Sequence, residues 1–357
     1  MLEKRRHVSA VYSTSSLVVL LCACLLFLSV YQLTSCPSPD VRLLPPSYLL
    51  ILPGNASLLP PPYPLNTLPP DDRTRLINLQ NFDFLINNFP CNDSNSSSLL
   101  LLVLVHSAPG NVDKRRTIRE TWGQNTGDMY RILFLLGDVQ SQESRMRLEE
   151  ENRVHRDLVQ GNFIDSYRNM TYKHVMALKW TAYFCPGARY LLKTDDDVFV
   201  NSPALLEFLA QDLSQWGARR LILCHYFLFA DVRRSWRSKW RVSPREYPGR
   251  LYPPYCAGWA VLYSPDVVFL LYREAQRVDY FWIDDVHVTG TLVARANLSH
   301  TPLGSLALER WQVNALIDSD DPAVVSSIGV FLFGAPDLPQ ESIYRLWEVV
   351  QRRRRSS

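Results

Sequence analysis

The chain has 357 residues, 47% of them hydrophobic, which is enough for one large folded domain or two smaller ones. Its formal net charge of +3 is close to balance and argues against a nucleic-acid-binding protein, which normally carries a strong basic field. The one dense basic run, residues 352–355, is typical of a solvated tail.

The N-terminus predicts a membrane anchor. Residues 8–33 contain no charged side chain, and about 20 apolar residues suffice to cross a bilayer as a helix. The basic residues within 1–7 favour a cytoplasmic N-terminus, so the rest of the chain would lie in the lumen. A cleaved signal peptide is the alternative, although the apolar stretch is long for one and no clear small-x-small cleavage site follows.

Two further features favour a lumenal location. Asn-x-Ser/Thr glycosylation sequons occur at Asn55, Asn92, Asn95, Asn169 and Asn297. Five of the seven cysteines lie beyond the predicted span, where an oxidising compartment favours disulfides. Because five is odd, at least one is free or pairs between chains, which leaves a disulfide-linked or non-covalent homodimer open. No Cys-x-x-Cys spacing occurs, which argues against zinc.

A proline-rich stretch separates the predicted span from the rest of the chain. Proline lacks a backbone donor and fixes its own φ, so residues 34–70 favour an extended spacer. We predict a stem over residues 34–98, a folded domain over 99–345 and a basic tail over 346–357.

Strands and helices alternate from residue 99 onward. Continuous apolar runs and amphipathic stretches predict strands at residues 99–106, 131–138, 162–165 and 190–193, and helices at 114–122, 141–160 and 169–184. This order predicts an α/β fold with a mostly parallel sheet. Ligands of such sheets bind just outside the carboxyl ends of the strands.

Three aspartates follow the last of these strands. Alternating side chains of a strand point in opposite directions, so Asp195 and Asp197 share a side and Asp196 points elsewhere. Two converging carboxylates suit Mg²⁺ or Mn²⁺, with water and substrate phosphates completing the coordination. A calcium EF-hand is excluded, because Phe199 and Val200 occupy positions that need a ligand and a glycine. An acidic turn that caps backbone groups is the alternative.

Three further segments carry residue types suited to binding or catalysis. Arg116 and Arg119 share a face of the predicted helix and suit the binding of phosphate. The alternative is a basic helix start that is simply exposed to solvent. Asp284 and Asp285 follow an aromatic cluster, where a carboxyl can act as a general base or cap a helix. Residues 250–264 offer aromatic surfaces for a sugar or a base, or form an ordinary core strand.

Together these segments resemble the β-1,3-glycosyltransferases of glycosyltransferase family 31, which includes galactosyl- and N-acetylglucosaminyltransferases. The matching motifs stand in the family's order over residues 99–295. They are RRTIRETW (115–122), FLLG (134–137), NFIDSYRNMTYK (162–173), KTDDDVFVN (193–201), YPPYCAGWAVLYS (252–264) and DDVHVTG (284–290).

The resemblance implies a GT-A type fold, a UDP-sugar donor and Mn²⁺. It makes Asp195, Asp197 and His300 the expected metal ligands, with Asp197 the surest, and makes Asp284 or Asp285 the base. The expected donor-binding residues are Arg116, Arg119, Lys193, Asp195, Asp196, Gly258 and Trp259.

This chain departs from the family pattern in two motifs. Gly258-Trp259-Ala260 replaces the frequent Gly-x-Gly, so Trp259 would narrow the donor or acceptor pocket. DDVHVTG is one residue longer than the common DDVYVG, which puts the spacing after Asp285 in doubt.

The resemblance implies an inverting transfer of a hexosyl group to a hydroxyl of a glycan on a glycoprotein or glycolipid. The sugar would be galactose, N-acetylglucosamine or N-acetylgalactosamine, and the enzyme a single-pass type II protein of the Golgi membrane. The alternatives are a glycan-binding or folding-assistance relative without turnover, and a metal-dependent lumenal hydrolase.

Overall fold

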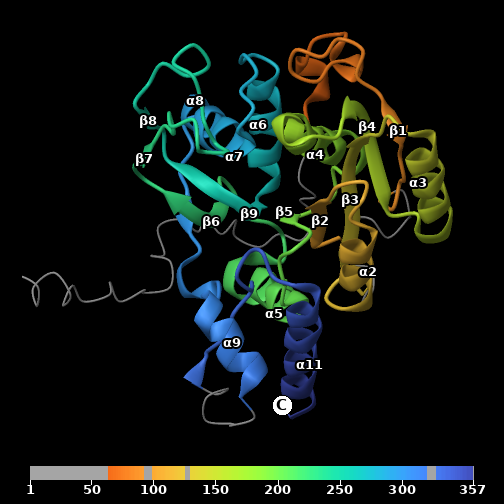
Figure 1. Ribbon diagram of the computed structural model, residues 1–357, viewed down its shortest axis with the longest axis vertical. Helices are drawn as coiled ribbons and strands as arrows, with labels where there is room; N and C mark the ends of the chain where they lie inside the picture. Colours follow the sequence, from red (N-terminus) through yellow and green to blue (C-terminus); the bar gives the residue numbers. More distant parts are fainter. Residues whose placement is uncertain (1–62, 92–98, 125–128, 320–326, 357) are drawn as a thin grey trace, which may run out of the picture. The chain divides into compact units, whose positions relative to one another are not determined.

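A computed structural model of the chain describes residues 63–91, 99–124, 129–319 and 327–356 (Figure 1). The predicted cytoplasmic tail, membrane span and first part of the stem lie outside these residues, as do Cys36, Asn55, Asn92 and Asn95. Among the residues that the structure describes, no helix is both long enough and apolar enough to cross a membrane.

An eight-stranded mixed sheet with the order β1-β4-β3-β2-β5-β9-β6-β10 forms the centre of the fold. Its strands are β1 (Phe84–Ile86), β2 (Leu101–His106), β3 (Tyr130–Asp138), β4 (Leu158–Ile164), β5 (Tyr190–Asp195), β6 (Ile222–Phe227), β9 (Tyr255–Tyr263) and β10 (Thr301–Pro302). The parallel arrangement predicted from the alternation is present in β4, β3, β2 and β5. Beyond β5 the sheet changes direction, because β9 is antiparallel to both β5 and β6.

Helices cover the sheet and extend beyond it. They are α2 (Val112–Glu120), α3 (Gln142–His155), α4 (Met170–Phe184), α5 (Ser202–Glu207), α6 (Pro265–Ala275), α7 (Asp284–Val286), α8 (Val293–Arg295), α9 (Arg310–Asp318) and α11 (Gln340–Ser356). A π-helical turn, η7 (His287–Leu292), continues α7. Two short strands, β7 (Ala230–Asp231) and β8 (Leu251–Tyr252), pair as a small separate sheet. Figure 1 shows α4 beside α6, and α11 beside α9.

The main core lies between α4, α6 and one face of the sheet. Successive strand residues face opposite sides, so alternate residues such as Leu102 and Leu104 of β2 and Leu133 and Leu135 of β3 enter this core. Helix α4, predicted as amphipathic, is buried along most of its length, from Thr171 to Ala182, and this stretch includes Lys173, His174 and Lys179, whose polar groups have partners inside the protein.

The predicted stem boundary is wrong, because residues 63–91 belong to the folded body. Strand β1 joins the edge of the sheet by pairing with β4. Lys179 of α4 donates hydrogen bonds to the backbone oxygens of Asp72 and Arg75. The Asp72 carboxylate also accepts from Tyr183 Oη at 2.7 Å. Proline content gave the wrong boundary, because apolar residues on both sides of the last proline pair, among them Leu68 before it and Leu76 and Phe82 after it, pack into the core.

The predicted separate tail over residues 346–357 is also wrong. Helix α11 runs through it, and Leu346, Val349 and Val350 are buried. The basic run at residues 352–355 therefore forms the last turn of a docked amphipathic helix, where positive charge complements the helix dipole.

Two disulfides link the described cysteines, Cys91 to Cys185 and Cys224 to Cys256. The first ties the segment before β2 to the end of α4. The second joins β6 to β9 on the side of the sheet where strand direction changes. Of the five cysteines predicted to face the lumen, Cys36 is the one outside the described residues.

Replacing Cys224 and Cys256 together by serine is expected to lower the free energy of unfolding by about 3–4 kcal/mol. The bond closes a loop with a sequence separation of 32 residues, and its removal releases that constraint on the unfolded chain. Urea unfolding of the double variant beside the unmodified protein measures the difference. A loss below about 1 kcal/mol would contradict the expectation.

Candidate active site

The acidic triplet lies at the carboxyl end of β5, beside the end of β2. Asp195 is the last residue of β5 and is in register with His106, the last residue of β2. The strands are parallel here, so their ends meet at one edge, as predicted. The three aspartates have different environments at this edge.

Asp195 is paired with a buried lysine. Lys193 Nζ lies 2.7 Å from Asp195 Oδ1 and also donates to the backbone oxygen of Gly258 on β9 at 2.5 Å. Burial raises the pKa of Asp195, and the nearby carboxylates Asp284 and Asp197 raise it further, while Lys193 acts in the opposite direction. Lys193 therefore connects the acidic triplet to the strand that carries Gly258.

The carboxylate of Asp196 is occupied by protein donors and shares Lys114 with Asp197, so the predicted grouping of Asp195 with Asp197, apart from Asp196, is not seen. Ser107 Oγ and Asn111 Nδ2 each donate to Asp196 Oδ2 at 2.8 Å. Lys114 Nζ contacts Asp196 Oδ1 at 3.1 Å and Asp197 Oδ2 at 2.8 Å. These contacts give Asp196 an anchoring role, and its predicted part in donor binding stays a prediction.

Asp195 and Asp197 carry oxygens of the type that hard divalent cations prefer, but each is paired with a lysine, and the predicted metal role stays a prediction. Asp195 and Asp197 supply carboxylate oxygens, and the Lys114 ammonium shows that Asp197 accepts a cation at a partly exposed position. The structure does not bring His300 into this set. Its Nε2 lies 2.7 Å from the Thr289 backbone oxygen, and its ring stacks on Tyr226. Among the described residues, no three His, Cys, Asp or Glu side chains gather closely enough to hold a metal ion by themselves.

The second acidic pair begins α7, and its two members have opposite electrostatic environments. Burial raises the pKa of Asp284, but the hydrogen bond from His174 and the charge of Lys193 outweigh it and lower the pKa overall. His174 Nδ1 lies 3.2 Å from Asp284 Oδ2, and its Nε2 lies 3.1 Å from Tyr263 Oη. A neutral ring that donates from Nδ1 and accepts at Nε2 satisfies both contacts. Asp284 is therefore held ionised.

Asp285 has a strongly raised pKa. Burial is the main cause, the charge of Asp284 adds to it, and Lys193 only partly offsets them. The carboxylate lies directly against Gly258, where an added Cβ would come within 1.8 Å of Asp285 Oδ1. Two adjacent carboxyls with pKa values driven apart are typical of acid–base sites.

An aromatic rim borders this pair. The rings of Tyr167 and Trp282 lie 6.0 Å apart, and Trp240 Nε1 donates to Tyr167 Oη at 2.6 Å. Burial raises the pKa of Tyr167, and the charges of Asp284 and Asp285 raise it further, which places the phenol near both carboxylates. Flat amphipathic side chains of this kind suit a sugar ring.

The predicted arginine cluster has mainly structural contacts. Arg119 pairs with Asp157 at 2.8 Å and with Glu151 at 2.7 Å, so its charge is already matched inside the protein. Arg116 is exposed and contacts Asp113 at 2.9 Å. The structure does not join either arginine to the acidic residues described above, and their predicted donor-binding role stays a prediction.

Trp259 and the two described sequons complete the predicted residues. The ring centroid of Trp259 lies 6.1 Å from that of Phe333, in the segment before α11, and the Trp259 backbone oxygen accepts from Thr194 Oγ1 at 2.8 Å. Asn297 is exposed, whereas Asn169 is partly buried and donates to the Ile164 backbone oxygen at 2.8 Å. Asn297 is therefore the more accessible of the two for glycosylation.

Sequence reasoning missed three residues of this site: Lys114, His174 and Tyr263. Lys114 stands in the basic run at the start of α2 and could have been considered with the arginines. His174 and Tyr263 have no local signal, because each acquires its role only when α4 and β9 meet beneath Asp284.

The comparisons with known proteins agree with the sequence motifs. A sequence model of the family described as Galactosyltransferase matches residues 113–304. Beta-1,3-galactosyltransferase 1 of Mus musculus is 35% identical over 219 residues, which are 60% of this chain and 66% of that relative. Beta-1,3-galactosyltransferase 5 of Gorilla gorilla gorilla is 34% identical over 212 residues, 58% of this chain and 70% of that relative. Among solved structures, the apo structure of the WbbM bifunctional glycosyltransferase matches 71% of this chain and 50% of its own, with a TM-score of 0.37 and 11% identity.

Proposed function

The chain belongs to the galactosyltransferase family, and from this premise we propose that it is an inverting β-1,3-glycosyltransferase with a GT-A type fold. It would transfer a hexosyl group, galactose first among the candidates, from a UDP-sugar to a hydroxyl of a glycan acceptor. N-acetylglucosamine and N-acetylgalactosamine are the other candidate sugars. The observation that carries the proposal is the pair Asp284 and Asp285, whose pKa values are displaced in opposite directions beside the acidic triplet.

In this proposal Asp285 is the base. A carboxyl with a raised pKa is a better proton acceptor for a sugar hydroxyl than an ordinary aspartate. Asp284, held ionised by His174, keeps a negative charge beside Asp285 and so sustains the raised pKa. The acceptor oxygen, on losing its proton to Asp285, attacks the anomeric carbon of the donor from the side opposite UDP. The bond to UDP breaks, and the anomeric centre inverts.

Asp197, with Asp195, would hold the divalent cation that we propose as Mn²⁺. The cation supplies positive charge for the departing diphosphate. Lys114 contacts Asp197 at 2.8 Å and would have to leave that carboxylate or share it. The aromatic rim of Tyr167, Trp240 and Trp282 would orient the acceptor sugar.

The cellular placement is part of the same proposal. A span at residues 8–33 would make the enzyme a single-pass type II protein with its catalytic domain in the Golgi lumen. Glycosylation at Asn297 would fit that compartment. A disulfide-linked or non-covalent homodimer is kept as a proposal.

The test is sugar transfer by the purified full chain. UDP release is followed with UDP-galactose, UDP-N-acetylglucosamine and UDP-N-acetylgalactosamine, with Mn²⁺ or with EDTA, over a panel of acceptor glycosides. Mn²⁺-dependent release with one donor, and a β-1,3 linkage in the product by NMR, would support the proposal. UDP binding by folded protein without transfer to any acceptor would favour the inactive relative.

Replacing Asp197 by alanine is expected to weaken UDP binding in the presence of Mn²⁺ by about tenfold, which corresponds to about 1.4 kcal/mol. The loss should vanish in EDTA, because the residue acts through the cation. Isothermal titration calorimetry measures both affinities. Asp212→Ala, an exposed aspartate on another helical segment, is the matched control. Equal loss with and without Mn²⁺ would contradict a metal-ligand role.

A further inference from the structure

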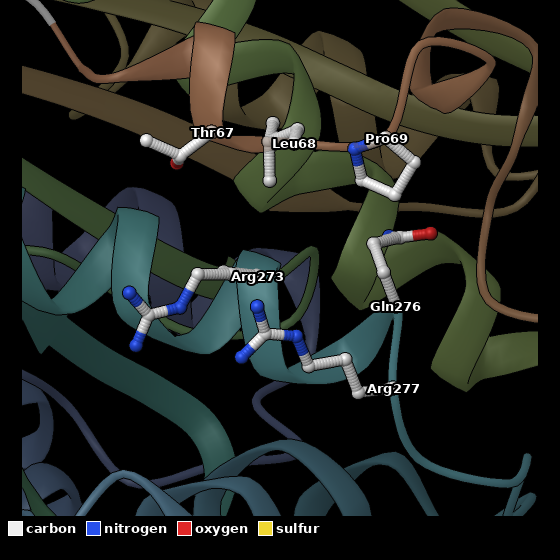
Figure 2. A pocket seen from close by; sticks show the side chains of 6 residues that line it. All are labelled: Thr67, Leu68, Pro69, Arg273, Gln276 and Arg277. Atoms are coloured by element: carbon white, nitrogen blue, oxygen red, sulfur yellow. The ribbon is translucent and has the colours of Figure 1, made fainter.

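A cavity away from the candidate active site lies between α6 and residues 67–69, which precede the sheet in sequence. It has a volume of about 260 Å³ and is lined by Thr67, Leu68, Pro69, Arg273, Gln276 and Arg277. Figure 2 shows Arg273, Gln276 and Arg277 on one side of the cavity and Thr67, Leu68 and Pro69 on the other. None of these residues belongs to the candidate active site.

The three polar groups gather around the carboxyl end of α6. Arg273 belongs to the last turn of the helix, whereas Gln276 and Arg277 lie in the turn that follows Ala275. The opposite wall is fixed in place. Ile77 N–H donates to Gln276 Oε1 at 3.1 Å, and Tyr63 stacks on Phe269 of α6 with ring centroids 5.6 Å apart.

One donor at this cavity has no partner. Gln276 Nε2 is a buried atom without an acceptor within hydrogen-bonding geometry, whereas Arg273 Nε lies 3.5 Å from Glu274 Oε1. The Gln276 carbonyl is used by Ile77, which leaves the amide group as a donor only. A buried donor without a partner costs about 1–3 kcal/mol, so the Gln276 amide favours an acceptor ligand.

The charge balance favours an anion. Glu274 is the carboxylate that the guanidinium groups share, with contacts to Arg273 at 3.5 Å, Arg277 at 3.2 Å and Arg295 at 3.7 Å. Arg295 does not line the cavity, so two guanidinium groups there stand against one carboxylate and leave one positive charge unmatched. Glu274 is itself nearly buried, whereas Arg273 and Arg277 stay accessible from the cavity.

The volume of the cavity and the residues that line it limit the class of ligand that it can bind. Small-molecule sites usually have volumes of about 300–1,000 Å³, so this cavity suits a group of monosaccharide size. Leu68 and Pro69 provide an apolar surface of the kind that contacts the C–H face of a sugar ring, and guanidinium forks match sulfate and carboxylate oxygens.

We propose that this cavity binds an acidic sugar, with the oxyanion against Arg273, Gln276 and Arg277 and the ring against Leu68 and Pro69. The oxyanion is a sulfate or a carboxylate. The proposal does not depend on the transfer reaction, because the cavity shares no residue with the candidate active site.

The test is calorimetric titration of the purified full chain with glucose 6-sulfate, glucuronate, inorganic sulfate and glucose. Saturable binding of an acidic sugar, tighter than inorganic sulfate and with no binding of glucose, is expected. The tighter of glucose 6-sulfate and glucuronate identifies the oxyanion. Binding of glucose as tightly as the acidic sugars, or no saturable binding of either acidic sugar, would overturn the proposal.

Three variants locate the binding in the cavity. Arg273→Gln keeps much of the side-chain length but removes its charge, and should weaken binding at least about tenfold. Gln276→Glu keeps an acceptor for Ile77 and places a negative charge in the cavity, so it should abolish binding. Arg295→Gln is the matched control, because Arg295 contacts Glu274 but does not line the cavity. Equal losses in Arg273→Gln and Arg295→Gln would mean general electrostatic attraction and would refute the site.

Discussion

Replacing Asp285 by asparagine should lower kcat by about 10²–10⁴-fold, the usual contribution of a positioned general base. Asparagine has nearly the same shape as aspartate, so the contact with Gly258 and the start of α7 are preserved. It cannot accept a proton from the acceptor hydroxyl. Binding of UDP should change little, because the proposed metal ligand Asp197 is untouched.

The pH dependence of activity gives the same variant a second readout. A base must be ionised to work, so activity should fall as the pH drops through the pKa of Asp285. Burial and the charge of Asp284 raise that pKa, so the acid limb should lie at higher pH than an ordinary aspartate would give. The residual activity of Asp285→Asn should lose this limb. A retained limb at the same pH would assign it to another group and would argue against Asp285 as the base.

The positions of the carboxylates could be predicted from sequence because they depend on local rules. A strand that ends in three aspartates places Asp195 at the ligand-binding edge of a parallel sheet, and this feature is present. The strand alternation does not extend past Asp195, where β5 ends, and Lys114 contacts both Asp196 and Asp197. The choice between Asp284 and Asp285 had no local signal. It depends on His174 from α4 and Gly258 from β9, which are far from the pair in sequence.

The errors in the predicted domain boundaries have a related cause. Proline content predicted where the chain could not be regular, but it carried no information on where the folded body begins. Leu76 and Phe82 are buried in the core because α4 and α6 leave an apolar surface that residues 63–91 cover. The ion-pair partners of Arg119 could not be predicted from the local sequence either, because Glu151 belongs to α3 and Asp157 to the loop after it. Tertiary contacts decided each of these points.

Gly258 provides the sharpest steric test of the proposed base. An alanine at position 258 would place its Cβ 1.8 Å from Asp285 Oδ1 and 2.7 Å from Asp285 Cγ. The Asp285 carboxylate would therefore have to move. A displacement of about 1 Å at a reacting group can cost about 10²-fold in rate, and we expect that loss in kcat for Gly258→Ala. UDP binding should be retained. The measurement is steady-state transfer with UDP titration on the same preparation.

A second glycine separates this steric effect from the general effect of losing a glycine. Neither Gly258 nor Gly110 has a positive φ, so alanine meets no left-handed backbone at either position. An added Cβ at Gly110 has no atom within 4 Å, although Gly110 lies next to Asn111, which binds Asp196. Gly110→Ala should therefore keep full activity. Full activity in Gly258→Ala would show that the Asp285 carboxylate can be displaced without loss of activity. Another residue would then have to be the base. If Gly258→Ala lost activity and Gly110→Ala did not, the loss would follow from the contact between residue 258 and Asp285. The hydrogen bond from Lys193 would not explain it, because Lys193 donates to the backbone oxygen of residue 258, which alanine also has.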